Sequence, residues 1–204
     1  MPHVTKPFSQ ACERNQEPIL DILRDVLTHS VEVLEIGSGT GQHAVFFARH
    51  LPHLLWQTSD LPEQHPGIYA WIAEAALPNV RAPLDIDVDA AVWPVRDMDA
   101  VFSANTAHIV GWPQVQHLFQ GVGRTLKPGG LLCLYGPFNY AGHFTSDSNA
   151  QFDVWLKQRD PRSGIRDFEA LDALAAAEGM RLAQDVTMPA NNRILVWRKL
   201  PSTG

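Results

Sequence analysis

Residues 31–41, Val-Glu-Val-Leu-Glu-Ile-Gly-Ser-Gly-Thr-Gly, constrain the fold more than any other stretch of this chain. Their first half has the β-branched and apolar residue types of a buried central strand, and residues 42–51 carry apolar side chains at helical spacing. Three glycines therefore lie at a strand-to-helix junction. There the backbone can approach a ligand closely, and the free N–H groups at the start of the helix point toward it. The stretch predicts a ligand site at the end of a strand.

The bulk properties of the 204 residues predict one soluble domain, with 45% apolar and 19% charged residues. No apolar run approaches the ~20 residues of a membrane span, and residues 1–10 lack the apolar middle of a secretory signal, so we expect a cytoplasmic protein without membrane contact. The net charge is −6 and Lys and Arg are scattered, which argues against a nucleic-acid partner. Isolated Cys and His residues predict no metal site. Monomer and homodimer both stay open.

The rest of the chain alternates between strand and helix patterns, which favours a parallel sheet. Residues 11–15 have a polar, irregular pattern. Helices are expected from Pro18, over 42–51 and 67–77, from Pro113, near 150–157, and from an N-cap at Asp167 to residue 178. Strands are expected over 31–36, 54–60, 83–88, 97–104, 131–135, 181–188 and 193–199, with a turn at 127–130. The last two strands have the alternation of an antiparallel hairpin.

Two later acids extend the predicted site. In alternating folds of this kind, ligands lie across the carboxyl ends of the strands, and an acid about 20 residues beyond the glycines accepts hydrogen bonds from ribose hydroxyls. Asp60 ends the second expected strand at that distance, with capping of the next turn as the alternative. Asp87, toward the end of the third expected strand, is the expected acceptor for an adenine amino group.

The residues around the glycines favour one kind of nucleoside ligand. A dinucleotide fingerprint needs its third glycine where this chain has Gln42. Glu35, two residues before the first glycine, would repel a pyrophosphate but would attract the ammonium group of an amino-acid-bearing cofactor. Together with the two later acids and the terminal hairpin, this pattern resembles the motif of class I S-adenosylmethionine-dependent methyltransferases.

That resemblance implies a fold, a cofactor and a set of residues. The fold is a single Rossmann-like α/β domain with a seven-stranded, mostly parallel sheet, an antiparallel C-terminal hairpin and helices on both faces. The cofactor is S-adenosyl-L-methionine, with S-adenosyl-L-homocysteine as its product. The expected cofactor-binding residues are Glu35, Gly37, Ser38, Gly39, Gly41, His43, Asp60, Asp87, Asn105 and Arg14. For His43 the alternative is helix capping, and for Arg14 it is a plain surface position.

A closer resemblance covers nearly the whole chain, which is similar to the family called domain of unknown function 938, including the methyltransferase-like 26 proteins. The segments that carry it are Glu-Arg-Asn at 13–15, Gly-Ser-Gly-Thr-Gly-Gln-His-Ala at 37–44, Asn-Thr-Ala-His-Ile at 105–109, Tyr-Gly-Pro-Phe at 135–138, Ser-Asn at 148–149 with Phe-Asp at 152–153, Gly-Ile-Arg-Asp at 164–167 and Met-Pro-Ala-Asn-Asn at 188–192. The family implies the cofactor and the fold, but not the methyl acceptor.

The candidate catalytic residues, His108 and Asn105, follow the fourth expected strand. His108, with an unperturbed pKa near ~6.5, would accept a proton from the acceptor, or else be hydrogen-bonded within its loop. Asn105 would orient the acceptor or contact the cofactor, or else cap the strand. The candidate acceptor-binding residues are polar or amphipathic groups expected at the strand-end rim, namely Tyr135, Asn139, Asn149, Asp153, Arg166 and Asn191.

Within a single domain of residues 1–204, four segments have different expected roles. Residues 1–30 cover the cofactor site, 31–135 form the cofactor-binding core, 136–165 form a substrate-side insertion, and 166–204 supply a C-terminal helix and the hairpin. The leading hypothesis is a methyltransferase that acts on a small-molecule substrate. The alternatives are a protein methyltransferase, an S-adenosylmethionine-binding module without catalysis, and a nicotinamide oxidoreductase, which Glu35 and Gln42 disfavour.

Overall fold

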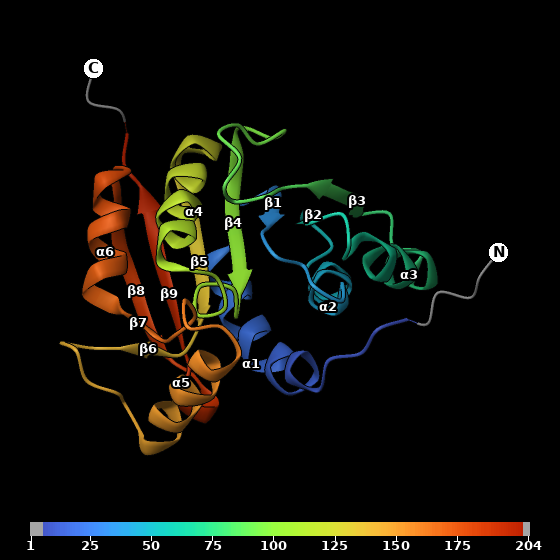
Figure 1. Cartoon of the computed structure of the whole chain (residues 1–204). Coiled ribbons are helices and arrows are strands. Elements are labelled where there is room, and N and C mark those ends of the chain that lie inside the picture. The colour runs from blue at the N-terminus through green and yellow to red at the C-terminus, as the bar shows by residue number, and fades with distance from the viewer. Residues whose placement is uncertain (1–5, 202–204) are drawn as a thin grey trace.

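The structure, a computed structural model, describes residues 6–201 and has one large sheet with helices on both faces (Figure 1). Residues 1–5, which belong to the expected segment 1–30, and residues 202–204, which belong to the expected segment 166–204, lie outside the described residues. The helices are α1 Gln10–Val26, α2 Gln42–His50, α3 His65–Ala75, α4 Trp112–Thr125, α5 Asp147–Arg159, α6 Phe168–Ala177 and the short 3₁₀ helix η1 Pro189–Asn191. The strands are β1 Glu32–Glu35, β2 Leu55–Asp60, β3 Val80–Asp85, β4 Met98–Ala104, β5 Leu126–Gly136, β6 Phe138–Asn139, β7 Arg166–Asp167, β8 Met180–Thr187 and β9 Arg193–Lys199.

The strand order of the large sheet is β3-β2-β1-β4-β5-β9-β8. The first five of these strands pair in parallel, and β9 is antiparallel to both β5 and β8. This confirms the expected Rossmann-like α/β fold with its antiparallel C-terminal hairpin. The chain winds in opposite directions from β1 and β4, so a crevice opens at the carboxyl ends of these two strands, where ligands bind in folds of this kind.

Strand β1 is buried on both faces because its side chains alternate between two cores. Val33 belongs to the core formed with α1 and α2, whereas Leu34 belongs to the core formed with α4 and α6. Both side chains are fully buried. The apolar run that marked this strand in the sequence is therefore a consequence of its central position. Among residues 6–201, no helix has both the length and the apolar character needed to cross a membrane.

The first helix begins earlier than predicted. We expected a start at Pro18, but α1 begins at Gln10, with Ser9 as its N-cap and the Ser9 Oγ accepting a hydrogen bond from the Cys12 N–H at 3.3 Å. The prediction was wrong because residues 10–17 are polar and lack an apolar stripe. Pro18 lies inside the helix, where it lacks the N–H of one backbone hydrogen bond, and the buried apolar residues just after it hold the helix on the sheet.

Two expected strand boundaries also need correction. The third strand was expected over 83–88, but β3 runs from Val80 to Asp85 because its first residues pair with β2. The expected turn at 127–130 lies within β5, where four residues stand opposite the single residue Asp99 of β4. Gly129 has a φ of +84° in this excursion, so the turn composition was correct, but the chain keeps strand pairing on both sides of it.

The region after β5 contains a feature that was not predicted. β6 and β7 form a separate two-stranded parallel sheet, in which Asn139 pairs with Asp167. Asp167 is the N-cap of α6 as expected, but its side chain makes no capping hydrogen bond. The preceding helix α5 starts three residues before the expected position because Ser146 caps it through the Asn149 N–H.

Candidate functional site

The glycine turn between β1 and α2 adopts a backbone conformation that glycine favours at all three positions. The φ angles of Gly37, Gly39 and Gly41 are +72°, +54° and +89°. A Cβ atom on Gly37 would lie 2.7 Å from the Thr106 Oγ1, and one on Gly41 would lie 3.0 Å from the Ile68 Cα. No heavy atom of the described residues lies within 4 Å of the equivalent position on Gly39. Packing therefore favours glycine at positions 37 and 41, whereas Gly39 faces open space.

Glu35 is a buried carboxyl group directly below this turn. It is 2% exposed, and its Oε2 accepts hydrogen bonds from the Ser38 Oγ at 2.9 Å and the Trp56 Nε1 at 3.1 Å. Burial raises the pKa of Glu35 to about 7, although the hydrogen bonds from Trp56 and Ser38 oppose that rise. We did not predict Trp56 as a site residue. Its one signal in the sequence is an indole N–H, which needs an acceptor when it is buried.

Asp60 caps its own turn, which is the alternative that the sequence left open, and it also contacts the glycine turn. Its Oδ2 accepts a hydrogen bond from the Gly39 N–H at 2.7 Å, and its Oδ1 accepts one from the Leu61 N–H at 2.8 Å. The first bond places the carboxylate beside the open glycine, and the second caps its own turn. Ser38, just after β1, is bonded to Ser59 on β2. Its N–H donates to the Ser59 carbonyl, and its Oγ accepts a hydrogen bond from the Ser59 N–H.

Asp87 and Asn105 lie on the loops that follow β3 and β4. Asp87 is exposed, lies beyond the end of β3, and accepts a hydrogen bond from the Asp89 N–H at 2.9 Å. Asn105 has a φ of +59°, and its backbone N–H donates to the Tyr135 carbonyl. Among residues 6–201, no protein group is hydrogen-bonded to the Asn105 side-chain amide, which leaves that amide available to a ligand.

His43 joins two helices. Its Nε2 lies 2.7 Å from the Asn15 Oδ1 of α1, and its ring stacks on Phe47 with the centroids 5.1 Å apart. Burial lowers the pKa of His43 to about 4, so the ring is neutral at neutral pH. The structure thus gives this predicted cofactor residue an interhelical contact. Arg14, on the adjacent position of α1, is exposed and has no hydrogen-bond partner among the described residues.

His108 is a buried residue beneath α5. It is 5% exposed, its ring meets Phe152 edge to face at 5.4 Å, and a Cβ on Gly136 would lie 3.4 Å from the His108 Nδ1. No side chain or backbone group of the described residues is hydrogen-bonded to its ring nitrogens. Burial, together with the positive charge of Arg166, lowers the pKa of His108 to about 4. The ring is therefore neutral near pH 7, but the lowered pKa makes it a weaker base than the ordinary imidazole that the sequence predicted.

The six residues predicted for an acceptor pocket have different surroundings. The Asn149 Nδ2 donates to the Asn191 carbonyl, the Asn191 Nδ2 donates to the Ser148 Oγ, and Asp153 is paired with Lys157 at 2.6 Å. Arg166 donates to backbone carbonyls. The side chains of these four predicted residues are therefore bonded to other groups of the protein and hold its segments together.

The other two predicted acceptor residues, Tyr135 and Asn139, lie at the carboxyl end of β5 and just beyond it. Burial raises the pKa of Tyr135, and the nearby Asn15 amide opposes that rise. The Asn139 Oδ1 is buried and accepts no hydrogen bond within residues 6–201. Both side chains are thus buried at the edge of the sheet that also holds Asn105 and His108.

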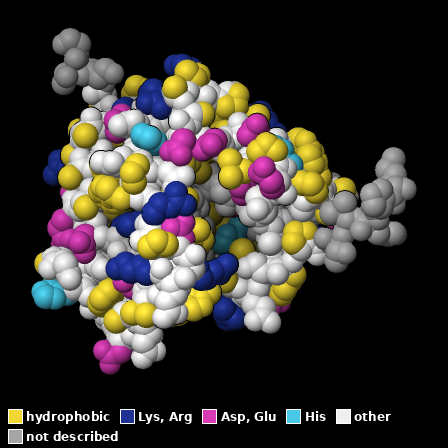
Figure 2. All heavy atoms as spheres, viewed as in Figure 1, with side chains coloured by type: hydrophobic (Ala, Val, Ile, Leu, Met, Phe, Trp, Pro, Cys, Tyr) yellow, Lys and Arg dark blue, Asp and Glu magenta, His cyan; other side chains and the backbone are white. Residues whose placement is uncertain are grey.

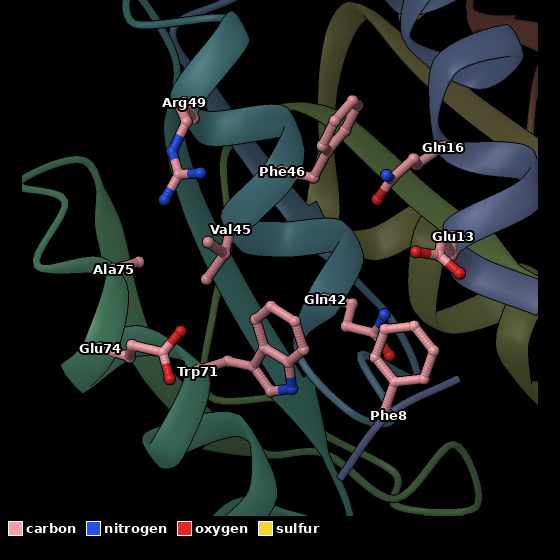
Figure 3. A pocket seen from close by; sticks show the side chains of 10 residues that line it. All are labelled: Phe8, Glu13, Gln16, Gln42, Val45, Phe46, Arg49, Trp71, Glu74 and Ala75. Atoms are coloured by element: carbon pink, nitrogen blue, oxygen red, sulfur yellow. The ribbon is translucent and has the colours of Figure 1, made fainter. Parts of the chain in front are cut away.

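The surface is hollowed near the middle of the face shown in Figure 2, between the end of β4 and the start of α2. A separate cavity of about 270 Å³ lies on the outer side of α2, and Figure 3 shows its lining side chains projecting from α1, α2, α3 and the segment before α1. That cavity is lined by Phe8, Glu13, Gln16, Gln42, Val45, Phe46, Arg49, Trp71, Glu74 and Ala75. It contains none of the predicted site residues, so it is distinct from the site around the glycine turn.

Gln42 explains why the segment before α1 lies against the glycine turn. The Ser9 N–H donates to the Gln42 Oε1, and the Thr40 Oγ1 donates to the same oxygen at 3.1 Å. The Trp71 Nε1 donates to the Pro7 carbonyl at 2.7 Å. The residue that stands where a dinucleotide fingerprint has glycine therefore ties the start of α1 to the start of α2. Within residues 6–201, no group of three or more His, Cys, Asp or Glu side chains is arranged to hold a metal ion.

Comparison with known protein families identifies the chain. Residues 6–199 match the family described as Protein of unknown function (DUF938). The chain belongs to the DUF938 family. This confirms the resemblance found in the sequence, and the match spans the sheet, the helices α1 to α6 and the glycine turn of this DUF938 protein.

Solved structures show that the DUF938 chain has a methyltransferase fold. An O-methyltransferase family protein from Burkholderia thailandensis superposes with a TM-score of 0.82 and 16% identity over 94% of this chain. The S-adenosylmethionine-dependent methyltransferase SibL gives 0.79 and 21% over 94%, and human N-acetylserotonin methyltransferase in complex with SAM gives 0.75 and 18% over 94%. The DUF938 chain spans 58%, 56% and 53% of these three proteins, respectively.

Proposed function

We propose that this DUF938 protein is an S-adenosylmethionine-dependent methyltransferase that acts on a small-molecule acceptor. The observation that carries the proposal is the turn in which the open Gly39 lies beside the Asp60 carboxylate and above the buried carboxyl group of Glu35. The structural neighbours support it, because their names describe methyltransferases, one of which is an O-methyltransferase family protein and another of which is in complex with SAM.

The residues present fit this cofactor. Glu35 would face its ammonium group, Asp60 its ribose hydroxyls and Asp87 its adenine amino group, and the space next to Gly39 is free of described atoms within 4 Å of a Cβ position. The N–H groups that follow β1 belong to a turn whose glycines expose the backbone. When bound, this cofactor supplies a methyl group on a sulfonium, whose transfer breaks the carbon–sulfur bond and leaves a neutral thioether.

The chain's own residues would position the acceptor and take its proton. Methyl transfer is an in-line displacement, so alignment and exclusion of water make the main contributions. The ring nitrogens of His108 are not bonded by any described residue, so His108 would accept the proton that a hydroxyl or amine acceptor loses, although its low pKa makes it a weak base. The Asn105 amide, which has no partner among the described residues, would orient either the acceptor or the methionine part of the cofactor.

We also propose that the four segments divide the work as follows. Residues 1–30 cover the cofactor site, which is supported by the Asn15–His43 contact and by the bond from Ser9 to Gln42. Residues 31–135 bind the cofactor, 136–165 form the acceptor side, and 166–204 complete the sheet. Within the described residues, the position of α5 against the His108 ring supports the third assignment.

The protein is expected to bind S-adenosylhomocysteine, a nucleoside that carries an amino acid, in preference to a dinucleotide. S-adenosylhomocysteine at about 100 times its Kd stabilises a protein by about 2.7 kcal/mol, which for a chain of this size raises Tm by about 5–10 °C. Differential scanning fluorimetry would measure this shift, with NADH as the comparison ligand. A shift with NADH and none with S-adenosylhomocysteine would exclude the methyltransferase proposal.

The same measurement tests Asp60 with a matched acid as control. Asp60→Ala is expected to abolish the shift, because it removes the carboxylate beside Gly39. Asp85→Ala should keep it, because Asp85 is the exposed register partner of Asp60 on β3 and is not hydrogen-bonded to the glycine turn within the described residues. Equal shifts in the two variants would contradict the assigned role of Asp60.

The acceptor can be found by incubating cell extract with cofactor that carries a labelled methyl group. Label in small molecules supports the proposal, label in protein favours a protein methyltransferase, and binding without transfer favours an inactive cofactor-binding module. With the acceptor identified, His108→Asn is expected to lower kcat by about 100-fold if a proton must leave. His117→Asn is the control, because His117 is exposed on α4 and pairs with Asp89. An undiminished kcat in His108→Asn would remove His108 from the mechanism.

A further inference from the structure

The loop that follows β4 is braced by a segment much later in the chain. Four consecutive backbone carbonyls, of residues 107–110, each accept a hydrogen bond from residues 163–166. The Ala107 carbonyl accepts from the Arg166 Nε at 3.0 Å, and the His108 carbonyl accepts from the Gly164 N–H at 2.9 Å. The carbonyls of Ile109 and Val110 accept from the Ser163 Oγ and the Arg166 Nη2, respectively.

Arg166 makes two of these four contacts and is itself fixed in place. Its Nη2 also donates to the Arg162 carbonyl at 2.9 Å, so three of its hydrogen bonds go to main-chain oxygens. The guanidinium carbon lies 6.0 Å from the centre of the Trp112 ring at the start of α4. A planar fork of donors suits this arrangement, because two carbonyls on one loop can be bonded together.

The bracing segment is in turn tied to α5. The Asp153 Oδ1 accepts a hydrogen bond from the Ile165 N–H at 2.8 Å, while the Asp153 Oδ2 pairs with Lys157. Phe152, the neighbour of Asp153 on α5, supplies the aromatic ring that meets His108 edge to face. The backbone of His108 and one side of its imidazole are therefore held by parts of the chain that meet at residues 163–166.

We infer that Arg166 is a positioning residue of the proposed methyl-transfer site. By bonding the carbonyls of Ala107 and Val110, Arg166 sets the position and orientation of the His108 imidazole. This inference rests on the proposed function for the use made of His108. It replaces the expected role of Arg166 in acceptor binding, because the Nε and Nη2 donors of Arg166 are already bonded to main-chain carbonyls. It also explains how the loop is held, through its backbone carbonyls. No described residue is hydrogen-bonded to the His108 ring nitrogens, so these nitrogens stay available to a substrate.

The test compares Arg166→Gln with Arg162→Gln. Arg162 belongs to the same segment, but its side chain is exposed and bonds only Asp160 among the described residues, so it is a matched control. Arg166→Gln is expected to speed amide hydrogen exchange at residues 107–110 and at Gly164 at least tenfold. It is also expected to raise the pKa of His108, followed by NMR of the labelled imidazole, because one positive charge is lost and the ring becomes more exposed. The His108 signal is assigned by its loss in His108→Asn.

S-adenosylhomocysteine affinity separates this inference from the function on which it rests. Wild type and Arg166→Gln are expected to bind it within threefold of each other, because the hydrogen bonds of Arg166 go to the loop after β4 and to Arg162 rather than to the glycine turn. No binding by the wild type would overturn the proposed function, whereas the exchange and pKa results would still decide the role of Arg166. If Arg166→Gln behaves like Arg162→Gln in both readouts, the inference is wrong.

Arg166→Lys gives a second test if the glutamine variant does not fold. Lysine keeps a positive charge near the loop but cannot bond two separated carbonyls in one plane. We therefore expect at least tenfold faster exchange at residues 107–110 in this variant, with a Tm within a few degrees of the wild type. Unchanged exchange in Arg166→Lys would overturn the claim that the guanidinium holds the loop.

Discussion

Glu35→Gln is expected to weaken S-adenosylhomocysteine binding at least tenfold at pH 8 and, in the absence of ligand, to raise Tm. Both effects follow from one buried carboxylate. The amide oxygen of the new glutamine would still accept hydrogen bonds from Ser38 and Trp56, so the variant keeps the local geometry but loses the charge that would face the ammonium group. The stability gain follows because an amide costs less to bury than a carboxylate.

The pH dependence of this effect has a definite sign. Burial raises the pKa of Glu35 from 4.5 to about 7, so the unfolded chain loses this proton at lower pH than the folded protein does. The free energy of unfolding therefore falls as the pH rises from about 4.5 to about 7, by up to about 3 kcal/mol for this group. The Tm advantage of Glu35→Gln should be small at pH 5 and largest at pH 8.

Calorimetry of unfolding and of ligand binding across this pH range would check both effects. The wild type is expected to bind S-adenosylhomocysteine more tightly as the pH rises through 7, because the carboxylate is then ionised, while the variant should show less dependence. Glu32→Gln is the control, since Glu32 lies on the same strand, is partly exposed and pairs with Arg81 at 2.9 Å. A variant that binds as tightly as the wild type at pH 8 would show that Glu35 does not contact the cofactor.

Gly37→Ala is expected to destabilise the protein by about 2–4 kcal/mol and to lower Tm by about 4–16 °C. Two costs add at this position. The φ of +72° is unfavourable for alanine, and the new Cβ would lie 2.7 Å from the Thr106 Oγ1. Urea unfolding would measure the loss. The double variant Gly37→Ala with Thr106→Ala should recover part of it, because only the backbone term then remains.

Gly39→Ala provides the contrast within the same turn. Its φ of +54° carries the backbone cost alone, of about 1–2 kcal/mol, because no atom of the described residues lies within 4 Å of the new methyl group. That methyl group would instead fill the space assigned to the nucleoside, so S-adenosylhomocysteine should bind at least tenfold more weakly. If Gly39→Ala binds normally, the cofactor does not lie over this glycine.

The fold could be predicted from the sequence largely because its central elements have local signals. β1 has a buried apolar residue on each face, α2 has an apolar stripe, and the glycines stand between them, so residue types alone placed the turn within one or two residues of its observed bounds. The start of α1 escaped prediction because residues 10–17 are polar. This part of the helix is defined by the Ser9 cap and by contacts with the glycine turn and α2.

The candidate site was predictable only where a residue acts next to its own strand end. Glu35, Asp60 and the glycines meet this condition, and the structure brings them together. The polar residues of the later segments were expected to face an acceptor, but Asn149, Asp153, Arg166 and Asn191 are bonded to the protein itself. Residue type alone does not show whether a polar side chain bonds a ligand or another loop.

The sequence by itself determined the glycine turn and the alternation of strand and helix, because each depends on neighbours a few residues apart. Only the tertiary structure decided that Trp56 bonds Glu35 and that Arg166 holds the loop of His108. The partners in these contacts are 21 and 59 residues apart in the chain. Contacts of this kind depend on which strands are neighbours in the sheet and on where β5 ends. No local sequence pattern encodes that arrangement.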